Sequence, residues 1–201
     1  MAHLALNSSY TVKEQNEMLH IAANSIRFGL DKHRENSIDP TQFPDSLRHN
    51  RATFVTLKKT DHLRGCIGSL IAYRPLVEDI SSNAYSAAFR DPRFDPLTSS
   101  ELNTLHIHIS VLSPPEKIFF DSEQNLLEQI QVGVDGIILS DQGHRATFLP
   151  SVWESLPDKS VFLSELKRKA GLSSNHWSDT VQVERYATFS FGEDVQNLLN
   201  T

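Results

Sequence analysis

The stretch Leu63-Arg64-Gly65-Cys66-Ile67-Gly68-Ser69-Leu70 carries the only cysteine of this 201-residue chain. It follows a strand-like segment, residues 52–57, and polar residues 58–62, so the two apolar segments predict a β-hairpin with Cys66 on its second arm. Glycines on both sides of the cysteine allow another backbone to approach closely. Because side chains alternate along a strand, Arg64 and Cys66 are expected on one face, where a guanidinium favours the thiolate.

The segments around this hairpin show helical and strand patterns in irregular order. Thr11 and Glu14 have the spacing of a capping box, and the residues after them have an apolar stripe at helical spacing. The predicted helices cover residues 11–30, 75–88, 121–130 and 158–170. The other predicted strands cover residues 105–112, 136–140, 145–149 and 181–191. Hairpins without regular βαβ alternation indicate the α+β class.

The composition is that of a soluble globular protein, with 39% apolar and 22% charged residues. The length predicts one domain, with room for two lobes. The net charge of −6 argues against non-specific binding of nucleic acid. No apolar run approaches the roughly 20 residues of a membrane span. Residues 1–7 lack the basic and apolar parts of a signal peptide. With a free thiol, these features predict a cytoplasmic protein.

Cys66 is a candidate nucleophile. It would need a nearby base, for which His106 or His108 is a candidate, and Arg64 would stabilise the negative charge. The alternative is a small residue packed in a tight hairpin, because free cysteine is among the most buried residue types. The sequence leaves both interpretations open.

His106 and His108 are separated by one residue on a predicted strand, so they face the same way. Two imidazoles on one face can chelate a metal, and Cys66 would make a third ligand. The simpler interpretation, which we favour, is two polar side chains on the solvated face of a half-buried sheet. We therefore predict no metal, with His106 and His108 as weak candidates, and the cofactor is left open.

Arg90 and Arg93 occupy a loop stiffened by Pro92. Two arginines can grip a carboxylate or phosphate, so they join Arg64, Gly65, Cys66 and Gly68 as candidate ligand-binding residues. Alternatively, Asp91 neutralises one of the arginines and fixes the loop. The sequence does not decide between these interpretations.

Several separated blocks together resemble the AMMECR-one domain family, most closely its bacterial branch, called AmmeMemoRadiSam system protein A. The resemblance covers roughly residues 10–190 of a single domain, residues 1–201. The blocks are Leu63-Arg64-Gly65-Cys66-Ile67-Gly68; Ala88-Phe89-Arg90-Asp91-Pro92-Arg93-Phe94 with Pro96-Leu97-Thr98; Ile109-Ser110-Val111-Leu112-Ser113-Pro114-Pro115; Gly133-Val134-Asp135-Gly136-Ile137; Phe148-Leu149-Pro150 with Trp153-Glu154; and Lys169-Ala170-Gly171-Leu172, followed by Trp177.

The resemblance implies a two-lobed α+β domain with a central antiparallel sheet flanked by helices. Bacterial relatives look like parts of a three-component set with a Memo-like protein and a radical-SAM protein, and no reaction is established for the family. Two hypotheses follow: an accessory protein that binds such partners, or an enzyme that uses Cys66 with Arg64 and a histidine. A nucleic-acid-associated regulator is a weaker third, and the oligomeric state is open.

Overall fold

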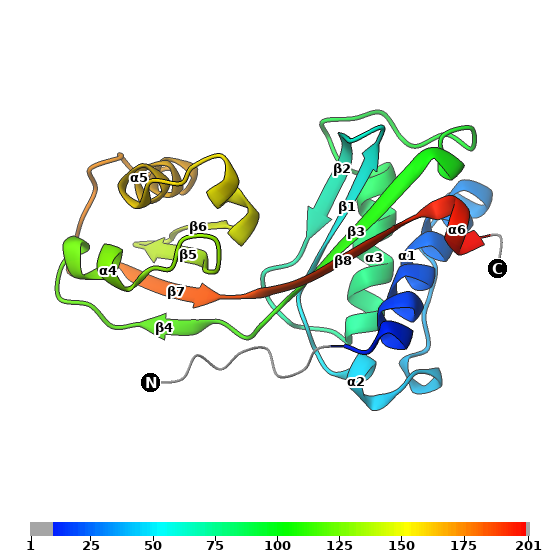
Figure 1. Cartoon of the computed structure of the whole chain (residues 1–201), viewed down its shortest axis with the longest axis horizontal. Helices are drawn as coiled ribbons and strands as arrows, with labels where there is room; N and C mark the ends of the chain where they lie inside the picture. Colours follow the sequence, from blue (N-terminus) through cyan, green and yellow to red (C-terminus); the bar gives the residue numbers. More distant parts are fainter. Residues whose placement is uncertain (1–9, 200–201) are drawn as a thin grey trace. The chain divides into compact units, whose positions relative to one another are not determined.

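The computed structural model describes residues 10–199 and divides the chain into two compact units (Figure 1). Unit 1 comprises Met1–Leu112 and Phe189–Thr201, and unit 2 comprises Ser113–Thr188. The amino-terminal segment that lacks the features of a signal peptide lies outside the described residues. Each unit contains one four-stranded sheet with helices, so the α+β class is confirmed, with the antiparallel strands shared between two sheets. No helix within residues 10–199 is long and apolar enough to cross a membrane.

The sheet of unit 1 contains the predicted hairpin. Its strands are β1 (Thr53–Lys59), β2 (His62–Gly68), β3 (Leu105–Leu112) and β8 (Thr188–Asp194), in the spatial order β2-β1-β3-β8. β1 pairs antiparallel with both β2 and β3. β2 is therefore an edge strand, and one row of its backbone groups has no neighbouring strand.

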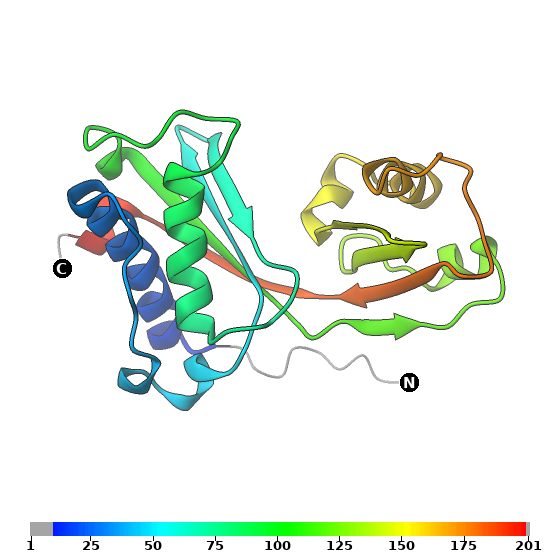
Figure 2. The same ribbon diagram turned by 180° about the vertical axis from the view of Figure 1, so that it is seen from behind.

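Two long helices, α1 (Val12–Lys32) and α3 (Leu76–Phe89), cover one face of this sheet (Figures 1 and 2). The predicted capping box begins α1: the Thr11 hydroxyl accepts the Glu14 N–H, and the Glu14 carboxylate accepts the Thr11 N–H. Shorter helical elements are η1 (Pro40–Gln42), α2 (Asp45–Arg48), η2 (Leu102–Thr104) and α6 (Val195–Leu199).

Strand alternation decides which side chains meet those helices. Val55 and Leu57 of β1, with Ile107 and Ile109 of β3, are fully buried in the core of unit 1. The residues between them, His108 among them, therefore project from the opposite, open face of the sheet.

A buried carboxylate joins α3 to the sheet. Asp79 accepts hydrogen bonds from the Thr53 N–H (2.9 Å) and hydroxyl (2.7 Å), from the Asn83 amide (2.9 Å) and from the Ser69 hydroxyl (2.8 Å). Arg74 adds an ion pair at 2.8 Å. These contacts fix the start of β1 and the chain after β2 to one helix.

Unit 2 contains the other sheet, in the order β4-β7-β5-β6. Its elements are β4 (Glu116–Ile118), α4 (Glu123–Gln129), β5 (Gly136–Asp141), β6 (His144–Phe148), η3 (Pro150–Glu154), α5 (Lys159–Lys169) and β7 (Gln182–Tyr186). In its core the Trp153 ring stacks on Phe162 at 3.6 Å between centroids. α5 ends as expected, with Gly171 at a positive φ of 80°.

The single strand predicted over residues 181–191 is wrong. The chain forms two strands there, β7 in unit 2 and β8 in unit 1, separated by Ala187. The Ala187 N–H donates to the Ser113 hydroxyl at 3.0 Å. β7 and β8 pair with strands of different sheets. The alternation of apolar and polar residues does not indicate where a chain changes from one sheet to another. β4 and α6 were also not predicted.

Gly65 provides a test of how closely β2 packs on α3. A Cβ atom at Gly65 would lie 2.1 Å from the Ala87 backbone oxygen of α3. Gly65→Ala must therefore separate strand from helix, and we expect a loss of more than about 3 kcal/mol in the free energy of unfolding, measured with urea.

Gly133→Ala is the control for this test. A Cβ there meets no atom within 4 Å, although φ is +78°, so the cost is limited to about 1–2 kcal/mol of backbone strain. Equal losses in the two variants would contradict the close packing.

Candidate functional site

A side-chain pair closes the free edge of β2 at Cys66. The Cys66 N–H donates to Asp91 Oδ2 at 2.8 Å, and Arg93 Nη2 donates to the Cys66 carbonyl at 3.2 Å. Asp91 and Arg93 also bind each other, Nε to Oδ1 at 2.9 Å and Nη2 to Oδ2 at 2.6 Å. The pair thus takes the place of a neighbouring strand for one residue of the edge.

Asp91 and Arg93 each stabilise the charged form of the other. Asp91 is only 4% exposed, and the hydrogen bond from Arg93 holds the pKa of Asp91 well below its usual range. The Asp91 carboxylate in turn raises the pKa of Arg93. Of the two interpretations that the sequence left open, the structure forms the internal ion pair.

Arg90 lies apart from that pair. Its guanidinium contacts Glu35 at 3.3 Å, with both side chains well exposed, and lies over the Tyr85 ring at 4.9 Å. The structure therefore does not join Arg90 and Arg93 in one anion grip, and a ligand-binding role for Arg90 stays a prediction.

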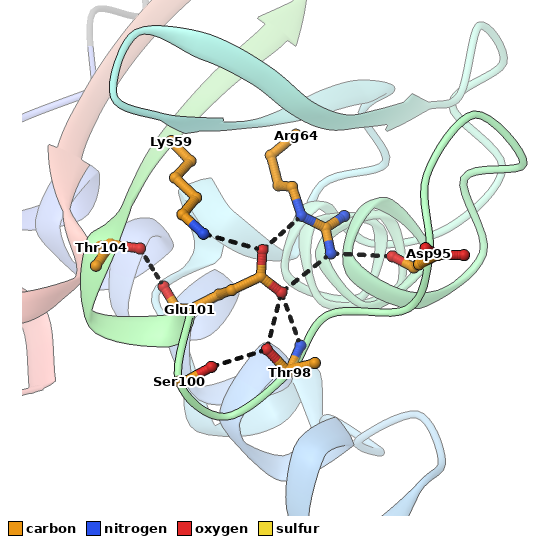
Figure 3. A network of polar contacts seen from close by, with 7 residues as sticks. All are labelled: Lys59, Arg64, Asp95, Thr98, Ser100, Glu101 and Thr104. Carbon is orange, nitrogen blue, oxygen red and sulfur yellow. Dashed lines mark hydrogen bonds and ion pairs between the residues drawn. The ribbon is translucent and has the colours of Figure 1, made fainter.

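Arg64 has a different partner from the expected thiol. The register slips between Leu57 and Lys58, which face Gly65 and Leu63, so Arg64 occupies a β-bulge. Its guanidinium binds Glu101 through two bonds, Nε to Oε1 at 2.9 Å and Nη2 to Oε2 at 3.2 Å (Figure 3). It also donates to the Asp95 carbonyl at 2.9 Å.

Glu101 is the centre of this second network. Besides Arg64, its carboxylate contacts Lys59 and accepts the Thr98 N–H and hydroxyl (Figure 3). The Arg64 hydrogen bond is the main cause that lowers the pKa of Glu101 to about 2. Two carboxylates, Asp91 and Glu101, thus fasten the loop after α3 to β2.

The Cys66 thiol belongs to a row of side chains across three strands. The Thr56 hydroxyl donates to Cys66 Sγ at 3.2 Å. Thr56 is the register partner of Cys66 on one side and of His108 on the other. Two strand spacings, about 9–10 Å, separate the backbone of Cys66 from that of His108, and the described hydrogen bond of Cys66 Sγ is with Thr56 rather than with His108.

His106 is also held by a carboxylate. Its Nδ1 lies 2.8 Å from Asp194 Oδ1 of β8. Burial lowers the pKa of His108, with smaller contributions from the charges of Lys58 and His106. Within residues 10–199 no three or more His, Cys, Asp or Glu side chains are placed to hold one metal ion, so Cys66 and the two histidines do not form the three-ligand group.

The two site arginines share a hollow. A cavity of about 470 Å³ is lined by Arg64, Arg93, Phe94, Asp95, Pro96, Thr98 and Glu101. Both guanidinium groups lie near the Phe94 ring, at 5.9 Å for Arg64 and 5.5 Å for Arg93. A ligand here would meet one aromatic surface and two arginines whose charges are already paired.

Three residues of this region were missed by the sequence analysis: Thr56, Phe94 and Glu101. Alternation along residues 52–57 predicts on which face of the strand Thr56 lies, but not which side chain it contacts. Glu101 is 37 residues from Arg64, and no local pattern indicates that pairing.

Comparison with known proteins shows the family of this chain. The family model AMMECR1 matches residues 19–191. This chain belongs to the AMMECR1 family. A protein of Methanothermobacter thermautotrophicus is 36% identical to it over 84% of this chain and 90% of its own length. A protein of Methanopyrus kandleri is 37% identical over 86% of this chain and 84% of its own.

A solved structure supports the same assignment. The crystal structure of the uncharacterized protein PH0010 from Pyrococcus horikoshii has a TM-score of 0.80 and 32% identity, over 89% of this chain and 91% of that one. These relatives are archaeal, so they support the AMMECR1 family and do not identify the bacterial branch.

The two loop arginines give a matched test of the edge closure. Arg93→Ala removes the partner of Asp91 and a donor to Cys66, so we expect a loss of about 2 kcal/mol in the free energy of unfolding. Arg90→Ala removes an exposed ion pair and is expected to cost at most about 1 kcal/mol. Urea unfolding measures both, and an equal or reversed order would contradict a structural role for Arg93.

The Glu101 network predicts an acid-dependent loss of stability. A carboxyl with a pKa of about 2 when folded and an ordinary value near 4.5 when unfolded stabilises the fold above pH 4.5. That contribution is lost as the pH falls towards 2. Glu101→Gln should therefore be less stable at neutral pH and lose less stability between pH 4.5 and 2, as measured by thermal unfolding. Parallel pH curves for variant and wild type would rule this out.

Proposed function

We propose that this AMMECR1-family protein is an accessory binding component that acts with Memo-like and radical-SAM proteins in the modification of a substrate. Its binding region is the hollow beside Arg64 and Arg93, next to the edge of β2. The partner classes rest on the family resemblance. The use of the site for binding rather than chemistry rests on its geometry.

The main support for a binding role is that the guanidinium groups of the site are already paired with carboxylates. Arg64 is held by Glu101 and Arg93 by Asp91, so neither guanidinium is left to activate a nucleophile. The described contact of Cys66 Sγ is with a threonine hydroxyl, and His108 lies two strands away from it. A nucleophilic thiol needs a base within reach, whereas a fixed surface suffices for binding.

One observation favours the alternative, an enzyme that uses Cys66. Arg93 Nη2 donates to the Cys66 carbonyl at 3.2 Å, so Arg93, rather than Arg64, is the guanidinium that lies beside Cys66. A substrate bound over the Phe94 ring could complete such a site.

The accessory role is tested by measuring binding to a purified Memo-like protein and to a purified radical-SAM protein by calorimetry. Cys66→Ser should bind as wild type does, because the serine hydroxyl replaces a thiol that only accepts a hydrogen bond. Phe94→Ala should weaken binding at least about tenfold if this ring is a central contact. Phe119→Ala in unit 2, where the ring is 83% exposed, is the matched control and should change nothing.

The pH dependence of Cys66 alkylation separates the two functions. An ordinary thiol, which reacts faster as the pH rises through the usual range of cysteine, supports the accessory role. A rate that levels off below about pH 7, with function lost in a folded Cys66→Ser variant, would overturn it in favour of the enzyme. Absence of binding to both partners would also overturn it.

A further inference from the structure

A second cavity lies within unit 2, at the point where β4 ends. Ile118, the last residue of β4, is the register partner of Val183 on β7. Beyond this pair, the loop from β4 to α4 lies opposite the segment that leads from α5 into β7 (Figure 1). The cavity between them has a volume of about 420 Å³, within the range of roughly 300–1,000 Å³ that is usual for small-molecule pockets. Its lining includes Phe119, Phe120, Asp121, Trp177 and Asp179.

One wall of this cavity is held by a buried carboxylate. Asp141, at the end of β5, has a fully buried side chain. Three alternate residues bond to its carboxylate: His176 through Nε2 at 2.6 Å, Ser178 through its hydroxyl at 2.8 Å and Thr180 through its hydroxyl at 2.6 Å. Both residues between these anchors line the cavity, so the fold itself sets their positions.

Aromatic rings form much of the apolar lining. The ring of Trp177, the first of those two residues, lies 5.5 Å from that of Phe120 between centroids, and both pack on the core of unit 2. The Phe119 ring is 83% exposed, although the Gln129 amide donates to its backbone carbonyl at 2.9 Å. An exposed ring on a fixed backbone, beside two packed rings, gives a ligand an apolar surface that needs little rearrangement.

Trp177 already contacts one ammonium group. Lys167 has a side chain that is only 1% exposed, and its Nζ lies 5.3 Å from the centre of the Trp177 ring and 2.8 Å from a carboxylate oxygen of Glu123. Lys167 is not among the residues that line the cavity, so its ammonium group contacts the ring from inside the unit. The chain thus already holds one cation between an aromatic ring and a carboxylate.

The charged groups of the lining favour a cation. Asp121 accepts a hydrogen bond from the hydroxyl of its neighbour Ser122 at 2.9 Å. Within residues 10–199, the Asp179 side chain makes no hydrogen bond or ion pair. Lys117 also lines the cavity, but the two carboxylates outnumber its ammonium group. A bound cation would therefore provide the ionic partner that Asp179 lacks.

We propose that this cavity binds a small aromatic amine in its protonated form. The ammonium group of the ligand pairs with Asp179, Asp121 adds to the negative charge around it, and the ring packs on Phe119 and Trp177. Charge-assisted hydrogen bonds to carboxylates and the faces of aromatic rings both attract an ammonium group. The site shares no residue with the hollow in unit 1, so it does not depend on the accessory role proposed above.

Phenethylammonium is the probe, with phenylethanol as its neutral match and hydrocinnamate as its anionic match. The chain has two tryptophans: Trp177 at the cavity and Trp153, which is 3% exposed in the core. A proton–nitrogen correlation spectrum therefore contains two indole N–H signals, which Trp177→Phe assigns. Phenethylammonium should shift the Trp177 signal to saturation, leave the Trp153 signal in place, and bind at least about fivefold more tightly than either match.

Three variants separate the parts of the site. Asp179→Asn removes the charge and should weaken the binding of phenethylammonium at least about threefold. Phe119→Leu keeps the apolar bulk but removes the ring, and should weaken it at least about twofold. Glu128→Gln is the matched control: this carboxylate on α4 accepts from the Gln124 amide at 3.2 Å and does not line the cavity, so binding should be unchanged. The Trp153 signal reports whether each variant is folded.

Three outcomes would overturn the proposal. The first is a Trp177 signal that does not respond to phenethylammonium. The second is equally tight binding of phenylethanol, which would show an apolar cavity without selection for charge. The third is an equal effect of Glu128→Gln and Asp179→Asn, which would show attraction to the acidic surface in general rather than a defined site.

Discussion

The carboxylate of Asp91 connects the backbone of β2 to the loop that covers it. One oxygen accepts the Cys66 N–H and also an arginine N–H, so strand, loop and guanidinium are fixed by one group. An edge strand without such cover offers its backbone to other chains. Arg93 is available to the Cys66 carbonyl because Asp91 neutralises and orients it. The geometry around the single thiol therefore depends on a residue that is itself almost fully buried.

The bulge at Arg64 has a similar consequence. A regular strand would place Arg64 beside Cys66, but the extra residue sends its guanidinium to Glu101 instead. Regular alternation and the bulge thus predict different directions for the Arg64 side chain, and the hydrogen bonds to the Glu101 carboxylate stabilise the direction that the bulge gives. Arg64 and Arg93 are each paired with a carboxylate, so their positive charges mainly stabilise the local structure. This pairing of both arginines is the basis of the binding role that we propose for the hollow around Phe94.

Local patterns were enough to predict much of the fold. Thr11 and Glu14 located the start of α1, and the apolar segments around residues 58–62 located the hairpin, because capping and alternation involve neighbours in sequence. The break at Ala187 escaped prediction because the pattern does not say which sheet a strand joins. The contacts of the candidate site were harder to predict from the sequence. Its pairs, Arg64 with Glu101 and His106 with Asp194, join residues 37 and 88 positions apart, and only the packed structure brings them together.

The same register that builds the core also sets the chemistry of the open face. A slip of one residue along β3 would expose Ile107 and Ile109 and bury His106 and His108, so burial of the isoleucines holds both imidazoles on the open side. β8 then decides what these rings meet. His106 lies against Asp194, and Ser110 lies against Ser190 at 2.8 Å, which places Gly192 opposite His108. The groups on this face are therefore positioned by strands rather than by a loop, and the other face of β3 is buried through Ile107 and Ile109.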